Sequence, residues 1–95
     1  MILAIDFDGT IHDHLNPIPG RHMGEPIEGA KEALEAFKRR KDTIIIFSVN
    51  RVPVIKAWML YWKIPFDDIT NTKPDADYYI DDKAITFTSW NNIKL

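Results

Sequence analysis

Short apolar runs recur along the chain and predict buried strands. Residues 2–5 and 43–47 are continuous runs of apolar and β-branched side chains, a pattern typical of strands buried on both faces in a parallel sheet. Residues 78–80 form a further short run. Residues 68–71 are short enough for an edge strand, and residues 85–88 for a last short strand. The chain therefore offers four or five strands for one sheet.

Two segments between these runs have helical periodicity. In residues 27–41 apolar side chains recur every three or four positions, with charged side chains between them. Pro26 suits the first turn of this helix, and the basic cluster at residues 38–41 suits its last turn, where cations complement the helix dipole. Residues 52–62 carry an apolar stripe. Packing in the core explains that stripe better than a cofactor site does.

A stretch rich in glycine and proline, residues 9–26, separates the first strand from the first helix. Loops of this length in compact domains are usually functional or disordered, so we expect an active-site loop or flap here. Two histidines at positions i and i+2, His12 and His14, could bind a transition metal. Only one further histidine, His22, is present and there is no cysteine, so we favour a loop in which His12 or His14 contacts substrate.

The alternation of strands with helices predicts an α/β fold with a mainly parallel sheet and right-handed crossovers. Ligands bind such sheets at the carboxyl ends of the strands. Asp6 and Asp8 follow the first strand, and Ser48 follows the second. Asp81 and Asp82 follow a later strand. We therefore expect these five side chains to meet at one edge of the sheet.

Composition narrows the class of protein. Ninety-five residues allow one domain, residues 1–95, and leave no room for a cap domain. A net charge of −2 argues against general nucleic-acid binding, and the absence of cysteine excludes disulfides, thiolate metal sites and cysteine nucleophiles. The apolar N-terminus stops at Asp6, too soon for a membrane span, and lacks the basic region of a signal peptide. We expect a cytoplasmic protein with no membrane partner.

The four carboxylates of Asp6, Asp8, Asp81 and Asp82 need a compensating cation. Like charges in a small pocket raise one another's pKa, so the four cannot all stay ionised without a positive charge nearby. Oxygen ligands alone favour Mg²⁺. An anionic substrate could then bridge to the metal.

Other residues suit the binding of a phosphate group. Lys73 supplies a fixed positive charge, and Ser48 and Val49 lie where a helix N-terminus begins and its N–H groups are free. Asn50 follows, and Arg51 either contacts a substrate anion or is solvated in the first turn. Carboxylate nucleophile, metal, lysine and helix N-terminus together suit phosphoryl transfer.

These residues resemble, in order, the four motifs of the haloacid dehalogenase (HAD) superfamily of phosphohydrolases. The segment DFDGT at residues 6–10, after an apolar strand, resembles the first motif, and Ser48 at the end of its strand resembles the second. Lys73, followed by proline, resembles the third, and the pair Asp81 and Asp82 resembles the acidic fourth. The resemblance spans nearly the whole chain and implies a small Rossmann-like three-layer sandwich of the HAD type.

The same resemblance implies Mg²⁺-dependent hydrolysis of a phosphomonoester. Asp6 would be the nucleophile that forms an aspartyl-phosphate. Asp8 would protonate the leaving group and then activate water. Ser48 would bind the transferring phosphoryl oxygens, and Lys73 would neutralise charge. The implied metal residues are Asp6, Asp8 through its backbone carbonyl, Asp81 and Asp82. The candidate substrate-binding residues are Ser48, Val49, Asn50, Arg51 and Lys73.

Several alternatives stay open at this point. Asp82 either supports the metal and its waters or pairs with Lys73. The same site could transfer the phosphoryl group to an acceptor other than water, or could belong to a non-catalytic phosphate- or metal-binding module. Asp8 argues against that module, because binding alone needs no acid or base. With only residues 9–25 as a lid, the site is open to a large or small phosphorylated substrate, or is closed by another subunit of a homo-oligomer.

Overall fold

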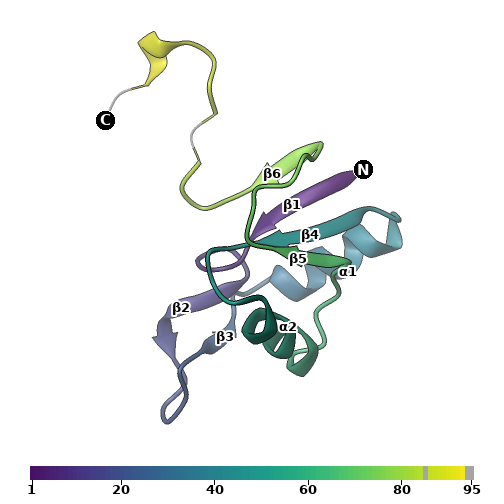
Figure 1. Cartoon of the computed structure of the whole chain (residues 1–95), viewed down its shortest axis with the longest axis vertical. Coiled ribbons are helices and arrows are strands. Elements are labelled where there is room, and N and C mark those ends of the chain that lie inside the picture. The colour runs from purple at the N-terminus through teal and green to yellow at the C-terminus, as the bar shows by residue number, and fades with distance from the viewer. Residues whose placement is uncertain (85, 94–95) are drawn as a thin grey trace.

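The computed structural model describes residues 1–84 and 86–93 (Figure 1). Its main sheet has four parallel strands in the order β5-β4-β1-β6. These strands are β1 (Ile2–Asp6), β4 (Thr43–Phe47), β5 (Asp68–Thr70) and β6 (Tyr78–Ile80). The other elements are the hairpin of β2 (His12–Pro17) and β3 (Gly24–Pro26), helices α1 (Ala30–Arg39) and α2 (Val52–Tyr61), and a one-turn 3-10 helix, η1 (Trp90–Asn92). The predicted α/β class, with a mainly parallel sheet and no cap domain in the described residues, is confirmed.

The core lies on one face of this sheet. Leu3 and Ile5 of β1 lie opposite Ile44 and Ile46 of β4, and the alternation along each strand points these four side chains to the same face. All four belong to a single buried cluster. Both helices contribute to that cluster, with Ala30 and Leu34 from α1 and Ile55, Trp58 and Met59 from α2. The continuous apolar runs of the sequence are therefore the strands at the centre of the sheet.

The irregular segment 71–77, which connects β5 to β6, contacts the other face of the sheet at Tyr79. Tyr79 of β6, adjacent in register to Ala4, donates a hydrogen bond from its hydroxyl to the Pro74 carbonyl at 2.7 Å and accepts one from the Ala76 N–H at 3.2 Å. Lys73 lies against the ring of Tyr79. An irregular segment thus stands where the predicted sandwich would have its third layer, because no helix forms between these two strands.

The first helix is shorter than the periodicity predicts. Its pattern covers residues 27–41, but α1 begins after Gly29, whose φ of 86° places it in the left-handed region. Pro26 ends β3 instead of opening the helix, because the N–H of the next residue, Ile27, donates to the Ile11 carbonyl at 2.8 Å. The prediction for α2 is confirmed within one residue. No helix in the described part of the chain is long and apolar enough to cross a membrane.

The segment predicted as a loop, residues 9–26, contains the antiparallel hairpin of β2 and β3. Its glycines and prolines hide the two-residue alternation by which a strand is normally identified. Gly24 is needed where the strands approach, since a Cβ there would lie 2.1 Å from the Asp13 carbonyl oxygen. The expected flap is therefore an ordered hairpin packed beside the sheet.

The chain leaves the sheet after β6. Figure 1 shows the C-terminal segment running away from the strands and helices toward η1. The strand predicted over residues 85–88 is wrong for residues 86–88, which are irregular, and Ile85 lies outside the described residues. Phe87 and Trp90 of this segment are both exposed and pack edge to face, with ring centroids 5.3 Å apart.

Candidate active site

A pocket of about 430 Å³ lies at the carboxyl ends of the strands. Register brings these ends level, because Asp6 of β1 lies opposite Phe47 of β4, and Ile5 lies opposite Ile80 of β6. Seven of the residues predicted as catalytic, metal-binding or substrate-binding line the pocket, namely Asp6, Asp8, Ser48, Val49, Lys73, Asp81 and Asp82. The structure therefore brings together residues that are far apart in the sequence, as the α/β topology requires.

Three of the predicted metal residues form a compact acidic cluster. Asp6, Asp81 and Asp82 each place one carboxylate oxygen within 4.8 Å of the others. Desolvation by burial, and after it the negative charge of Asp81, raises the pKa of Asp6 above the ordinary value of 3.8. A hard divalent cation bound by these oxygens would offset their repulsion, and all-oxygen donors suit Mg²⁺. In the described residues the carboxylate of Asp8 is not part of the cluster.

Gly9 allows the carboxylate of Asp82 to reach this cluster. Its φ of +82° lies in the left-handed region, and a Cβ at this position would lie 2.3 Å from Asp82 Oδ2. The turn around it is held by the N–H groups of Ile11 and His12, which both donate to the Phe7 carbonyl at 2.9 Å. The glycine of the DFDGT segment thus has a steric role as well as a conformational one.

Asp8 is held through both of its carboxylate oxygens. His12 Nδ1 lies 2.8 Å from Oδ1, and Asn50 Nδ2 donates to Oδ2. The side chain of Asn50, predicted to bind substrate, is therefore engaged by Asp8. His12 is buried and contacts Asp8, whereas His14 is exposed and lines the pocket. Of the two histidines expected near substrate, only His14 lies in the pocket wall.

The loop that carries Ser48 is fixed by hydrogen bonds from a residue that the sequence pattern did not single out. Asn71 Nδ2 donates to the carbonyls of Ser48 at 2.7 Å and Asn50 at 2.6 Å. Ser48 Oγ accepts a hydrogen bond from the Asn50 N–H at 3.1 Å. Asn71 directly follows β5, so it occupies the same kind of position as the predicted residues after the other strands. Its position directly after a predicted strand is the feature of the sequence that could have identified Asn71.

Of the remaining predicted residues, Lys73 and Val49 line the pocket and Arg51 does not. Lys73 Nζ lies 4.5 Å from the ring centroid of Tyr79, and in the described part of the chain it forms no ion pair with Asp82. Val49 is fully exposed at the rim. Arg51 caps α2 in an extended conformation and does not line the pocket, which matches the solvated alternative.

Comparison with known proteins bears on the fold. No protein-family model matches the chain, and no curated protein matches it. Among solved structures, the chain is similar to a conserved protein from Bacteroides thetaiotaomicron, with a TM-score of 0.70 and 27% sequence identity. The similarity covers 96% of this chain and 84% of that protein. It supports the α/β fold over nearly the whole chain.

Proposed function

We propose that this chain is a capless, Mg²⁺-dependent phosphomonoester hydrolase that works through an aspartyl-phosphate on Asp6. The observation that carries the proposal is the convergence of Asp6, Asp81 and Asp82 within 4.8 Å of one another. Ser48 and Lys73 lie in the same pocket and supply a hydroxyl donor and a positive charge. This set matches the needs of phosphoryl transfer, where positioning and charge neutralisation dominate.

The acidic cluster would hold the metal. Asp6, Asp81 and Asp82 offer only oxygen donors at a spacing that suits one divalent ion. Bound Mg²⁺ would polarise a phosphoryl oxygen and neutralise the charge that accumulates between carboxylates and phosphate. Burial first, and then the charge of Asp81, raise the pKa of Asp6, so a bound cation would relieve the part of this cost that comes from the neighbouring carboxylates.

The covalent steps fall to Asp6 and Asp8. The Asp6 carboxylate attacks phosphorus and forms an acyl phosphate, while the phosphorus–oxygen bond to the leaving group breaks and its oxygen takes the proton of Asp8. Water then attacks the acyl phosphate and gives a proton back to Asp8, which releases inorganic phosphate and restores the Asp6 carboxylate. A single positioned carboxyl group thus serves both half-reactions.

The other pocket residues hold the phosphoryl group. Ser48 Oγ already accepts a hydrogen bond from the Asn50 N–H, which leaves its own proton free to donate to a phosphoryl oxygen. Lys73 is held beside the pocket by Tyr79 and brings a compact positive charge. The pocket has no cap domain in the described residues, so a small phosphate ester and a phosphorylated macromolecule can both reach it. The cytoplasmic location expected from the sequence stays a prediction.

The test is hydrolysis of a panel of phosphomonoesters with Mg²⁺, with excess EDTA, and with the Asp6→Asn variant. We expect turnover by the unmodified protein, its loss in EDTA, and a decrease of at least about a thousandfold in Asp6→Asn, which keeps the side-chain volume but removes the nucleophile. Asp75→Asn is the matched control, because Asp75 is exposed and does not line the pocket. Full activity of Asp6→Asn would refute the mechanism. Binding of Mg²⁺ without turnover of any ester would favour the non-catalytic module instead.

A further inference from the structure

His12 is a buried histidine whose two ring nitrogens both have partners. Only 4% of the residue is exposed. Nδ1 lies 2.8 Å from Asp8 Oδ1, and Nε2 lies 2.8 Å from the backbone nitrogen of Gly24. A backbone N–H can only donate, so Nε2 must accept and carries no proton. The neutral ring therefore has its proton on Nδ1 and donates it to Asp8.

The ring of His12 is also fixed by its aromatic neighbours. Phe7 stacks on it with ring centroids 5.0 Å apart and an interplanar angle of 16°. Trp58 meets it edge to face, with centroids 5.3 Å apart. Rotation of the ring would break both hydrogen bonds and leave buried polar groups without partners, which is unfavourable. The orientation of His12 is thus determined by packing as well as by hydrogen bonding.

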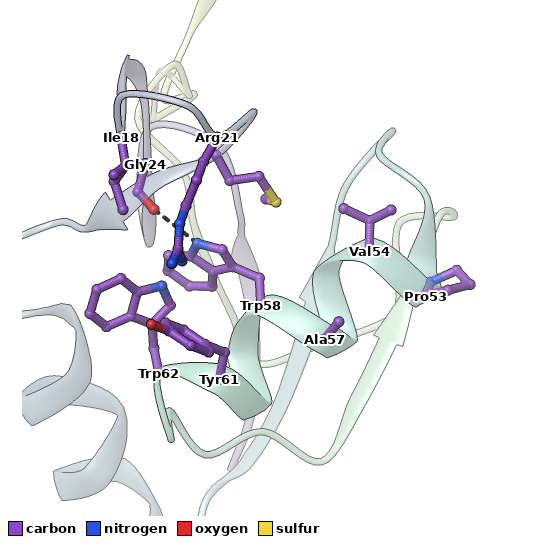
Figure 2. Close-up of a pocket in the computed structure, with 10 residues that line it drawn as sticks. Ile18, Arg21, Gly24, Pro53, Val54, Ala57, Trp58, Tyr61 and Trp62 are labelled. Carbon is purple, nitrogen blue, oxygen red and sulfur yellow. Dashed lines mark hydrogen bonds between the residues drawn. The ribbon is translucent and has the colours of Figure 1, made fainter.

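The backbone of Gly24 is also anchored by α2, through its carbonyl. Trp58 Nε1 donates to the Gly24 carbonyl at 3.0 Å, and Figure 2 shows this bond beside Arg21, Tyr61 and Trp62. The hairpin cannot shift easily at this point, because the close approach of its strands admits only glycine at position 24. Hydrogen bonds to the two successive peptide groups that flank the Gly24 Cα therefore link α2 through the hairpin to His12 and the acid–base carboxylate.

We propose that His12 is a positioning residue for Asp8, and that the hairpin of β2 and β3 fixes the histidine tautomer that does this. The Gly24 N–H selects the ring form that donates from Nδ1 to Oδ1, while Asn50 holds Oδ2. Each oxygen of Asp8 keeps a second site directed elsewhere, where Asp8 can hold the proton that goes to the leaving group and can later accept the proton of water. The kinetic part of this inference rests on the proposed hydrolase function. By this inference, the segment that we expected to be a flap, residues 9–26, supports the acid–base group of Asp8.

Two substitutions of His12 separate its two hydrogen bonds. In His12→Asn the amide nitrogen can take the place of Nδ1 and donate to Asp8, but the partner of the Gly24 N–H is lost. In His12→Gln the longer side chain can place its oxygen near the position of Nε2 and accept from Gly24, but the donor to Asp8 is lost. Both variants lose the aromatic ring, so the comparison between them cancels the loss of packing.

The kinetic readout compares an aryl phosphate with a good leaving group and an alkyl phosphate whose leaving group needs protonation. We expect His12→Gln to lower kcat on the alkyl ester by about a hundredfold, the size of a general-acid contribution, with a much smaller loss on the aryl ester and little change in KM. His12→Asn should recover most of the lost rate. Equal losses in both variants and on both esters would show a merely structural role and would overturn the positioning role.

A second readout does not depend on activity. Long-range proton–nitrogen NMR spectra of the unmodified ¹⁵N-labelled protein report which imidazole nitrogen of His12 carries the proton. We expect a protonated Nδ1 and an unprotonated Nε2. A proton on Nε2, or exchange between the two forms, would overturn the proposal even if phosphate esters are hydrolysed. The expected tautomer in a protein that hydrolyses no ester would refute the proposed function and leave the contact between His12 and Asp8 standing.

Discussion

Replacing Gly9 with alanine tests whether the acidic cluster depends on the close approach of Asp82 to the turn after β1. The added Cβ would lie 2.3 Å from Asp82 Oδ2 and 3.0 Å from its Cγ. Ordinary contact begins near 3.4 Å, so Oδ2 must move by roughly 1 Å, away from its position beside Asp6 and Asp81. The φ of +82° at this position adds backbone strain for any residue with a Cβ.

Gly20→Ala is the matched control for that strain. Gly20 has a φ of +79°, and a Cβ there would meet nothing within 4 Å. The two substitutions therefore add the same methyl group in the same backbone conformation, but only Gly9→Ala touches the acidic cluster. Gly29→Ala, with a φ of +86° and the same open surroundings, is a second control at the start of α1.

The expected magnitudes differ between stability and metal binding. Gly20→Ala and Gly29→Ala should lose about 1–2 kcal/mol of unfolding free energy, the cost of a left-handed conformation for a residue with a Cβ, and Gly9→Ala should lose at least as much because its Cβ also clashes with Asp82. For a domain of this size, that loss lowers the melting temperature by about 4–16 °C. Only Gly9→Ala should weaken Mg²⁺ binding, by about 10- to 100-fold, the usual effect of disturbing the surroundings of a metal ligand.

Thermal unfolding at increasing Mg²⁺ concentration measures both quantities. A bound ligand stabilises the folded state by RT ln(1 + [L]/Kd), so each tenfold loss of affinity removes about 1.4 kcal/mol of stabilisation at saturating Mg²⁺. We expect Gly20→Ala and Gly29→Ala to keep the Mg²⁺-dependent rise in melting temperature and Gly9→Ala to lose most of it. The same rise in all three variants would refute the steric link between Gly9 and the cluster.

Three further measurements follow from the structure. Burial and the neighbouring carboxylates raise the pKa of Asp6, so its ionisation destabilises the folded state at neutral pH. In EDTA at pH 7, Asp6→Asn should therefore have a higher melting temperature than the unmodified protein. Below about pH 3.8 the two melting temperatures should be equal. Hydrogen bonds, chiefly from Arg40, lower the pKa of Asp42. The ionised carboxylate therefore stabilises the folded state above about pH 4, and this stabilisation is lost as the pH falls further. Asp42→Asn should flatten the decrease in melting temperature between about pH 4 and pH 2. Trp58→Phe removes the donor to the Gly24 carbonyl and should lower the free energy of unfolding in urea by about 1–2 kcal/mol, and an unchanged unfolding midpoint would contradict that bond.

The central strands and the second helix could be predicted because burial leaves a local mark on the sequence. The runs at residues 2–5 and 44–47 are apolar at every position because all of these side chains except Ile2 are buried or half-buried, and residues 52–62 repeat with the period of a helix. The hairpin within residues 9–26 could not be predicted in this way. Its pairing depends on a glycine contact and on packing against Trp58, which leave no periodic pattern in the segment itself.

The sequence by itself determined which residues stand at the ends of the strands. Asp6, Ser48 and Asp81 each end or follow an apolar run, and parallel strands bring their carboxyl ends to one edge. The identity of the acidic cluster is thus encoded locally, because a strand ends where its apolar run ends. The resemblance to the HAD motifs rests on the same local features.

Only the tertiary structure decided which partners these residues have. His12 lies next to the acidic motif in sequence, but its tautomer is fixed by Gly24, and Asn50 reaches Asp8 across a separation of 42 positions. Gly9 matters because of Asp82, which belongs to another strand end. Hydrogen bonds and steric contacts of this kind act between segments that folding brings together, so no local pattern records them.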